Sequence, residues 1–359
     1  MAKLAGARGD FADIVPYDPK YLPADELLSA NENPEDVPAE VRQAIDARFA
    51  TMAFNRYPDP LANELRDTIA QAYGLERNYV LAGNGGDELL FNLALCWGGP
   101  GRTFLNVPPT FSVYAANAKL TGTAMVEVPR RDDFTIDEAA VLDRVAQGGI
   151  DFIVITSPNN PTGDCARQEF LLELLGATDA LVLVDEAYAE FSGQSIVPYL
   201  REYQNLAVLR TFSKAYSLAG VRVGYLLANP QVIREFIKVR QPYSTDVVSQ
   251  MIATEVMRNR AAFEPGIKAI VDQRDQLQTQ LRALPNVQVF ESQANYILLR
   301  VPRAAEVWQR LYDAGVLIRD FSNAPGLQDC LRVTVGSEKE NRIFFATLRD
   351  ILDEFVGRD

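Results

Sequence analysis

The sequence predicts an α/β fold in which a mostly parallel central sheet is flanked by helices and joined to a smaller α+β domain. From about residue 78, short apolar runs alternate with amphipathic stretches of helical period, which is typical of parallel strands covered on both faces. The chain has 359 residues, 48% of them apolar, and this length exceeds what one core usually supports. We therefore expect a large domain at 34–259 and a smaller one formed by 1–33 with 260–359.

The strands of the central sheet are expected where the apolar runs are short and bounded by turn residues. They are Tyr79–Ala82, Thr103–Val107, Phe152–Thr156, Leu181–Val184, Ala207–Arg210 and Val223–Ala228. Helical patterns separate several of these runs, and this alternation favours parallel pairing through helical crossovers.

The second half of the chain predicts bridging helices and the small domain. Residues 245–283 form long amphipathic patterns, with an interruption expected at Pro265–Gly266. The small domain is expected to contain the strand Ala294–Arg300, the helix Arg303–Ala314, the strand Cys330–Val335 and a final helix Lys339–Phe355.

Charge and hydropathy exclude several classes of partner. The formal net charge of −13 repels phosphate backbones and anionic lipid, so neither nucleic acid nor a membrane is expected to bind. The sequence has no apolar stretch as long as a signal peptide or a membrane span, which indicates a cytoplasmic protein. Cys96, Cys165 and Cys330 lack paired spacing and are interpreted as core thiols rather than disulfide or metal-binding residues.

The chain contains no histidine. This absence excludes Ser/His/Asp and Cys/His nucleophile arrangements as well as histidine-ligated metals. The remaining reactive side chains are Lys, Tyr, Asp, Glu and Arg. An enzyme restricted to these groups often relies on an organic cofactor for its difficult step.

Polar residues follow two neighbouring strands of the predicted sheet. Asp185 and Tyr188 come after one strand, where a helix-capping Asp and a packing Tyr are the ordinary alternative. Thr211, Ser213 and Lys214 come after the next strand. Of the seven lysines, only Lys214 follows an apolar strand, and a strand-end cleft lowers an amine pKa as Schiff-base chemistry requires. A solvent-exposed lysine is the alternative.

Three further segments suit an anionic cofactor. Gly83–Glu88 follows a strand and opens a helix, so its amide groups can hold a phosphate. Arg222 precedes the last strand of the sheet and offers a bidentate donor, although an ordinary surface arginine is the alternative. Ser157–Gly163 predicts a loop with a cis proline that turns an asparagine amide toward the cleft.

Taken together, these motifs resemble the class I/II aminotransferases, which depend on pyridoxal 5'-phosphate (PLP) and have the fold of type I PLP-dependent transferases. The resemblance spans nearly the whole chain, and its motifs occur in the family's order. They are Ser29–Pro34 (SANENP), Asn55–Pro60 (NRYPDP), Gly83–Glu88 (GNGGDE), Ser157–Gly163 (SPNNPTG), Asp185–Phe191 (DEAYAEF), Thr211–Tyr225 (TFSKAYSLAGVRVGY) and Cys330–Ser337 (CLRVTVGS).

The resemblance implies a role for each of these cofactor residues. Lys214 matches the lysine that forms the Schiff base, Asp185 the carboxylate beside the pyridine nitrogen, and Asn160 and Tyr188 the donors to the phenolic oxygen. The residues that match phosphate-binding positions are Gly86, Asp87, Thr211, Ser213 and Arg222, with Tyr57 reaching the phosphate from the partner subunit of a homodimer. Phe111 matches the aromatic residue that stacks on the ring.

The likeness is strongest to the enzymes that exchange an amino group between histidinol phosphate and 2-oxoglutarate in histidine biosynthesis. Arg332 and Arg319 match the two arginines that bind the substrate anion, and Asn160 and Tyr57 also face the substrate. Tyr17 and Asn33 are expected at the pocket entrance.

Three positions depart from the family pattern: Phe111 replaces a usual Tyr, Gly86 a frequent hydroxyl residue, and Ser217 a frequent Gly. The loss of a Tyr hydroxyl keeps open two alternatives, an aromatic amino acid aminotransferase and a threonine-phosphate decarboxylase. A non-catalytic PLP-binding regulator is disfavoured because only about thirty residues precede the Asn31–Pro34 motif and the net charge is negative. A structural protein with decayed sites is disfavoured because the core catalytic groups are present.

Overall fold

The fold was analysed in a computed structural model, which describes residue 6 and residues 22–356. Its larger sheet has seven strands in the order β2-β8-β7-β6-β5-β3-β4, and β8 is antiparallel to both neighbours while the other pairs are parallel. The strands are β2 Val80–Gly83, β3 Thr103–Asn106, β4 Ala124–Glu127, β5 Phe152–Thr156, β6 Leu181–Asp185, β7 Leu206–Thr211 and β8 Gly224–Ala228. The α/β fold with a mostly parallel sheet is therefore confirmed.

The six strands expected in this sheet are present, each within one residue of the expected bounds. The expectation missed β4, which forms the edge of the sheet and pairs only with β3 among the described strands. Three of its four residues are exposed. Its apolar run is only three residues long, Ala124–Val126, and is shorter than the runs that predicted the other strands.

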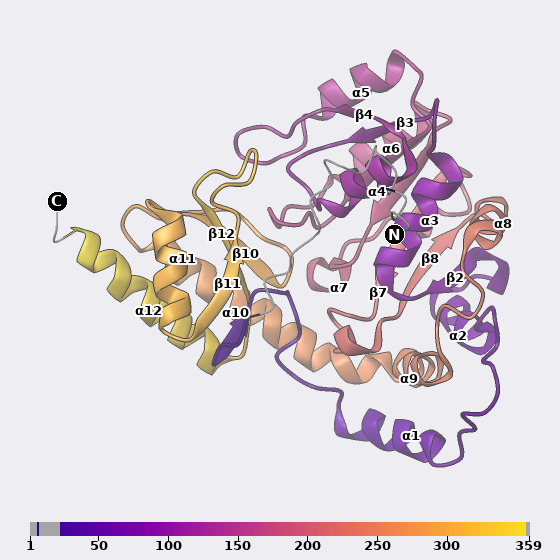
Figure 1. The fold of residues 1–359 in the computed structure, drawn as a ribbon, viewed down its shortest axis with the longest axis horizontal. Helices are drawn as coiled ribbons and strands as arrows, with labels where there is room; N and C mark the ends of the chain where they lie inside the picture. The colour runs from indigo at the N-terminus through magenta and orange to yellow at the C-terminus, as the bar shows by residue number, and fades with distance from the viewer. Residues whose placement is uncertain (1–5, 7–21, 357–359) are drawn as a thin grey trace, which may run out of the picture.

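Helices cover both faces of the seven-stranded sheet, as Figure 1 shows. The helices α3, α4 and α8 share one apolar core with the sheet, while α2, α5 and α6 pack into the core on the opposite face. The helices of this part of the chain are α1 Ala39–Phe49, α2 Asn63–Tyr73, α3 Gly85–Trp97, α4 Val113–Thr121, α5 Glu138–Ala146, α6 Gln168–Gly176, α7 Ala189–Ser192 and α8 Pro230–Val239. Both faces are buried, which explains why the strands are apolar throughout.

The bridging region forms two α-helices, α9 Val247–Arg258 and α10 Glu264–Arg282, joined by the 3-10 turn Arg260–Phe263. The expected interruption at Pro265–Gly266 was wrong in position, because both residues lie in the first turn of α10. The first turn of a helix tolerates proline, since its amide has no intrahelical acceptor there. The chain therefore breaks before the proline.

A second sheet of five strands stands beside the first, in the order β1-β11-β12-β10-β9. Its strands are β1 Glu26–Leu28, β9 Gln288–Val289, β10 Tyr296–Arg300, β11 Val316–Asp320 and β12 Cys330–Thr334. The expected strands and helices of the small domain are present, but β1, β9 and β11 were missed. β1 pairs in parallel with β11, so a segment near residue 26 joins a sheet built from the last quarter of the chain.

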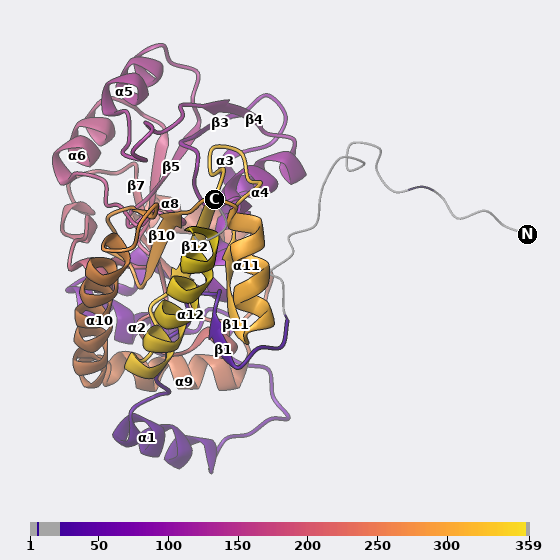
Figure 2. The same cartoon turned by 90° about the vertical axis from the view of Figure 1, so that its left-hand side faces the viewer.

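Three helices lie side by side along the second sheet in Figure 2: α10, α11 Ala304–Asp313 and α12 Glu338–Val356. They share apolar side chains with β10 and β12 in the main core, including Leu277, Leu311 and Phe344. The division into domains at 34–259 and at 1–33 with 260–359 stays a prediction.

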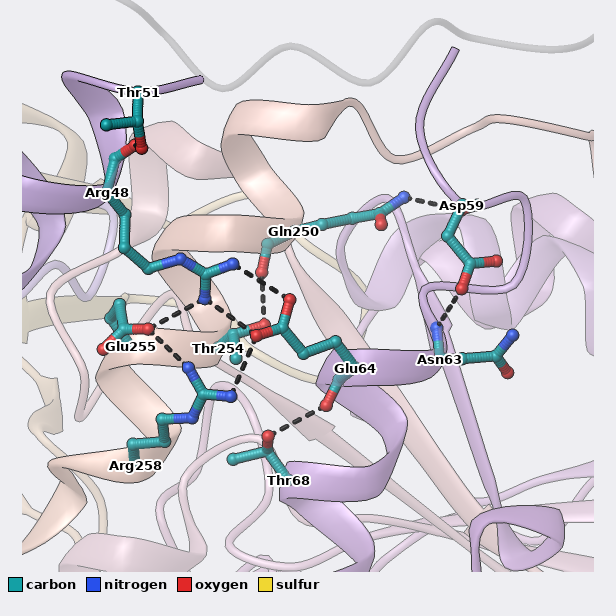
Figure 3. A network of polar contacts seen from close by, with 10 residues as sticks. All are labelled: Arg48, Thr51, Asp59, Asn63, Glu64, Thr68, Gln250, Thr254, Glu255 and Arg258. Carbon is teal, nitrogen blue, oxygen red and sulfur yellow. Dashed lines mark hydrogen bonds and ion pairs between the residues drawn. The ribbon is translucent and has the colours of Figure 1, made fainter. Parts of the chain in front are cut away.

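A cluster of charged residues fastens α1 to α2 and α9, as Figure 3 shows. Arg48 of α1 and Arg258 of α9 both bind Glu64 of α2 and Glu255 of α9, at N–O distances of 2.6–2.9 Å. Glu255 is mostly buried whereas Glu64 is 53% exposed. Because most of the cluster faces solvent, we attribute the attachment of α1 mainly to its buried Val41 and Ile45.

Among the described residues, no helix is long and apolar enough to cross a membrane.

The three cysteines were expected to be core thiols. The thiols of Cys96, Cys165 and Cys330 are free, with Cys330 buried and the other two partly buried. Burial raises the pKa of Cys96 to about 12 and that of Cys165 to about 11, so both are protonated, unreactive thiols at neutral pH.

Candidate active site

A cavity of about 580 Å³ lies where the carboxyl ends of β5, β6 and β7 meet the start of α3 and the second sheet. This is the edge of a parallel sheet at which ligands usually bind. Twelve of the fifteen predicted site residues line it: Gly86, Asp87, Phe111, Asn160, Asp185, Tyr188, Thr211, Ser213, Lys214, Arg222, Arg319 and Arg332. Tyr57 and Asn33 do not line it, and Tyr17 lies outside the described residues.

Lys214 follows β7 and extends its amine into this cavity. The amine donates a hydrogen bond to the carbonyl oxygen of Ala30 at 2.8 Å and lies 5.9 Å from the centre of the Tyr188 ring. The pKa of Lys214 is lowered to about 8, mainly by burial and also by the charge of Arg332. The alternative of a solvent-exposed lysine is therefore wrong, whereas Lys119, Lys238, Lys268 and Lys339 lie in helices, as expected.

Asp185, the last residue of β6, is 4% exposed and has a protein donor for each carboxylate oxygen. Its Oδ1 accepts from the amide of Ala187 at 3.0 Å, and its Oδ2 accepts from the hydroxyl of Tyr114 at 2.7 Å. Burial raises the pKa of Asp185 to about 6. Sequence reasoning missed Tyr114, the second residue of α4, whose ring packs edge-on against that of Phe111 just before the helix.

Tyr188 is buried, and its ring packs edge-on against Tyr296 at 5.0 Å. Its hydroxyl accepts a hydrogen bond from the side-chain amide of Asn31 at 3.0 Å. The packing expected of an ordinary tyrosine is therefore present, and the hydroxyl also joins an amide of the N-terminal segment. Sequence reasoning did not single out Asn31, which is buried and has a left-handed backbone with φ of 55°.

The glycine-rich turn opens α3, as expected, and it lies against Arg222. One guanidinium nitrogen of Arg222 donates to Asp87 at 3.0 Å, and the other lies 3.4 Å from the hydroxyl of Ser213. A Cβ on Gly85 would meet that guanidinium at 2.7 Å, so the turn admits the arginine only because it has no side chain. Hydroxyls, a guanidinium and helix-start amides thus face one end of the cavity, which suits a phosphate.

The loop Ser157–Gly163 and β12 meet on the opposite side of the cavity. The peptide bonds before Pro158 and Pro161 are both cis, whereas the sequence predicted one. Arg332 of β12 donates to the side-chain oxygen of Asn160 and, at 2.6 Å, to the carbonyl of Ser29. Arg319 of β11 is the register partner of Arg332, so the two guanidinium groups occupy one face of the second sheet.

Phe321, which sequence reasoning missed, lies between these arginines. Its ring centre is 5.9 Å from the guanidinium carbon of Arg319 and 5.6 Å from that of Arg332. Cation–π contact of this kind orients a guanidinium without using its hydrogen-bond donors. The wall formed by the second sheet is therefore cationic and pre-oriented.

Two expected residues stand outside the cavity. Asn33 donates to the carbonyl of Ala215 at 3.3 Å and accepts from the amide of Glu35, so it closes a turn rather than facing the pocket. Tyr57 is 82% exposed and stacks on Tyr243 with ring centres 4.7 Å apart.

Comparison with known proteins agrees with this site. The family model described as "Aminotransferase class I and II" matches residues 25–348. The chain belongs to this family. This aminotransferase is 40% identical to histidinol-phosphate aminotransferase 1 of Carboxydothermus hydrogenoformans over 343 residues. The matched region covers 95% of this chain and 97% of the relative. It is 36% identical to the histidinol-phosphate aminotransferase of Chlorobaculum tepidum, over 89% and 92% of the two chains.

Solved structures show the same fold. The histidinol-phosphate aminotransferase of Sinorhizobium meliloti, solved in complex with pyridoxal-5'-phosphate, has a TM-score of 0.89 at 22% identity and covers 99% of both chains. That of Clostridium acetobutylicum has a TM-score of 0.85 at 24% identity, over 92% of this chain and 99% of its own. At these identities the likeness concerns the fold.

The cofactor of this aminotransferase is PLP, and the donor groups of the cavity fit it. The amine of Lys214 suits the aldehyde, the carboxylate of Asp185 suits the ring nitrogen, and the turn beside Arg222 suits the phosphate. Of the three departures from the family pattern, Ser217 has the clearest structural meaning. Its φ is 56°, in the left-handed region that glycine adopts without strain.

Proposed function

We propose that this aminotransferase transfers an amino group from L-histidinol phosphate to 2-oxoglutarate. The main support for this proposal is one cavity that contains both the amine of Lys214, whose pKa is lowered, and two arginines, Arg319 and Arg332, on the facing wall. The curated relatives named histidinol-phosphate aminotransferase, at 36–40% identity over most of the chain, support this substrate.

The cofactor roles in this proposal follow from the resemblance to the class I/II aminotransferases, and the position of these side chains around one cavity supports them. Lys214 binds the aldehyde carbon, and Asp185 holds the proton of the ring nitrogen. Asn160 and Tyr188 hydrogen-bond the phenolic oxygen, and Phe111 stacks on the ring. The phosphate is bound by Gly86, Asp87, Thr211, Ser213 and Arg222, which line one end of the cavity.

The proposed catalytic step is a proton transfer by Lys214. PLP, when bound, withdraws electrons from the substrate carbon that loses its proton. With the substrate amine in place of the Lys214 amine on the cofactor, the freed Lys214 amine would act as the base that takes up this proton and later returns it. An amine with a pKa of about 8 has a far larger unprotonated fraction at neutral pH than an ordinary lysine.

Arg332 and Arg319 are proposed to bind the anionic end of both substrates. A planar guanidinium accepts a phosphate or a carboxylate in the same bidentate geometry, so one site serves histidinol phosphate and 2-oxoglutarate in turn. Because Asn160 and Ser29 already hold Arg332, little side-chain entropy is lost when a substrate binds.

We further propose a homodimer in which Tyr57 completes the partner's site. Tyr57 is exposed and lies outside the cavity of its own chain, which supports a role across an interface. The test mixes Lys214→Ala chains with Tyr57→Ala chains. Recovery of activity in the mixture, with neither variant active alone, supports the shared site, whereas an inactive mixture or a monomer in solution contradicts it.

The free thiols support a location in the cytoplasm, where cysteines remain reduced. We propose that location for the enzyme. Cell fractionation with an antibody to the full chain tests it.

A spectral titration tests the substrate assignment. Histidinol phosphate is added to the PLP-loaded protein while the visible absorbance of the cofactor is recorded. We expect this band to bleach with histidinol phosphate, to return with 2-oxoglutarate, and to be insensitive to both in Lys214→Ala. Bleaching only with aromatic amino acids favours an aromatic aminotransferase, release of carbon dioxide from threonine phosphate favours the decarboxylase, and failure to take up PLP contradicts the proposed chemistry.

A further inference from the structure

Tyr114 lines the cavity, and its hydroxyl is buried beside Asp185. Tyr114 is the second residue of α4 and is 4% exposed. Its hydroxyl donates to Oδ2 of Asp185 at 2.7 Å and lies 2.8 Å from the hydroxyl of Thr156. Thr156 and Asp185 are register partners at the ends of β5 and β6, so the phenol joins a helix to two neighbouring strand ends.

The direction of these hydrogen bonds follows from the number of protons. The phenol has one proton, and the carboxylate of Asp185 accepts it, so the hydroxyl of Thr156 must donate to the phenolic oxygen. The other carboxylate oxygen accepts from the amide of Ala187. Each oxygen of Asp185 is thereby held by one protein donor, and the chain of donors is polarised toward the carboxylate.

The charges around Asp185 make this donor important. The pKa of Asp185 is raised to about 6, mainly by burial, with a smaller contribution from the negative charges of Asp87 and Glu186. The hydrogen bonds from Tyr114 and from the amide of Ala187 lower it. The cations Lys214 and Arg222 line the same cavity. Deleting the hydroxyl of Tyr114 therefore raises the pKa of Asp185 and favours its protonated form.

We propose that Tyr114 is a positioning residue, whose hydroxyl holds the carboxylate of Asp185 in the orientation that binds the ring nitrogen of the cofactor. This inference rests on the proposed role of Asp185. It requires more of Tyr114 than packing: the ring already packs edge-on against Phe111 at 5.6 Å, and a phenylalanine would keep that contact. The hydroxyl is the group under test.

The experiment compares Tyr114→Phe with Tyr73→Phe in the full chain. Tyr73 is the matched control, because its hydroxyl also makes a 2.8 Å bond to a buried partner, the hydroxyl of Tyr225, which is not among the groups that act on Asp185. The first measurement is the melting temperature of the PLP-free protein between about pH 5 and about pH 9. This range begins about one unit below the folded pKa of Asp185 and ends about three units above it.

The expected sign follows from proton binding. The folded chain holds the Asp185 proton up to about pH 6, whereas the unfolded chain releases it near the ordinary value of 3.8, so the stability from this group falls as pH rises through that window. Tyr114→Phe raises the folded pKa, so we expect the decline to extend to higher pH. Tyr73→Phe should follow the wild-type profile, offset by a constant amount.

The second measurement is the rate of PLP release from the loaded protein, which we expect to increase about tenfold in Tyr114→Phe and little in Tyr73→Phe. The inference is overturned if the pH profile of Tyr114→Phe parallels the wild type or if its release rate equals that of the control. A wild-type chain that takes up no PLP, together with a shifted profile in Tyr114→Phe, would instead sink the proposed function and leave the link between Tyr114 and Asp185 intact.

Discussion

The two walls of the cavity are built in different ways. The cofactor wall consists of strand ends of one sheet, where Asp185 ends β6 and Lys214 follows β7. The substrate wall carries Arg319 and Arg332 on a second sheet, and Arg332 is held by the carbonyl of Ser29, 303 residues earlier in the chain. The first wall takes its reactive groups from the ends of strands in the large sheet, and the N-terminal segment contacts it through Ala30 and Asn31. The second wall carries its arginines on the small sheet and requires that sheet to dock.

In the proposed function, the cofactor wall carries out the reaction and the substrate wall binds the substrate anion. Groups fixed at neighbouring strand ends keep their mutual distances when the small sheet shifts, so we expect substitutions there to abolish the reaction. A cationic wall on a separate sheet can change its side chains without disturbing the cofactor. A family with one reaction and many substrates is the outcome that such a division favours. The predictions below test the division, beginning with the largest expected effect.

Lys214→Ala removes the proposed base and the bond to the cofactor. We expect transamination to fall by at least about 10⁴-fold in steady-state assays, because both functions are lost together. Lys238→Ala is the control, since this lysine is exposed on α8 and pairs with Glu235. Equal activity in the two variants would show that the cofactor wall has been misassigned.

The pH dependence of PLP uptake examines the same wall without turnover. Because the pKa of Lys214 is lowered to about 8, its unprotonated fraction should rise through pH 8, and the rate of PLP uptake by the cofactor-free chain should rise with it. A stopped-flow series provides the midpoint. A midpoint near that of an ordinary lysine, at about pH 10.4, would mean that burial does not lower this pKa.

Arg332→Lys tests the substrate wall. A lysine keeps the charge but lacks the planar guanidinium whose two terminal nitrogens bind Asn160 and Ser29 and which can bind an anion in bidentate geometry, so we expect KM for the amino donor to rise about 10–100-fold. The kcat of the half-reaction should change much less. Arg300→Lys on the neighbouring strand β10 is the control and should leave KM unaltered. A loss confined to kcat in Arg332→Lys would contradict the separation of the two walls.

Ser217→Gly gives the smallest expected effect and concerns the loop that carries Lys214. The left-handed backbone of Ser217 costs about 1–2 kcal/mol, part of which glycine loses again through its freedom in the unfolded chain. We expect a net gain of about 0.5–1 kcal/mol, measured by chemical denaturation, with activity unaltered. Ser217→Ala keeps the strained backbone and should give no gain. An equal gain in stability in both variants would contradict the assignment of the effect to the left-handed backbone of residue 217.

Much of the site was predictable because the end of a buried strand is visible in the sequence as an apolar run followed by polar residues. The apolar run before Asp185, and the run before Lys214, each place a polar residue at the same edge of the sheet. The glycine-rich turn before α3 is likewise a local signal. By contrast, β4 was missed because its apolar run has only three residues. Tyr114 was missed because a tyrosine inside a helix resembles core packing.

The six strands of the large sheet with apolar runs, the residues at their ends and the family could be predicted from the sequence, since these depend on side-chain type and spacing along the chain. The strands β1, β4, β9 and β11 could not. The contact of Ser29 with Arg332, the hydrogen bond from Tyr114 to Asp185 and the positions of Asn33 and Tyr57 outside the cavity became visible only in the folded chain. Contacts of this kind depend on how distant segments pack. They leave no periodic pattern in the text of the chain, because packing selects for shape and satisfied hydrogen bonds rather than for spacing.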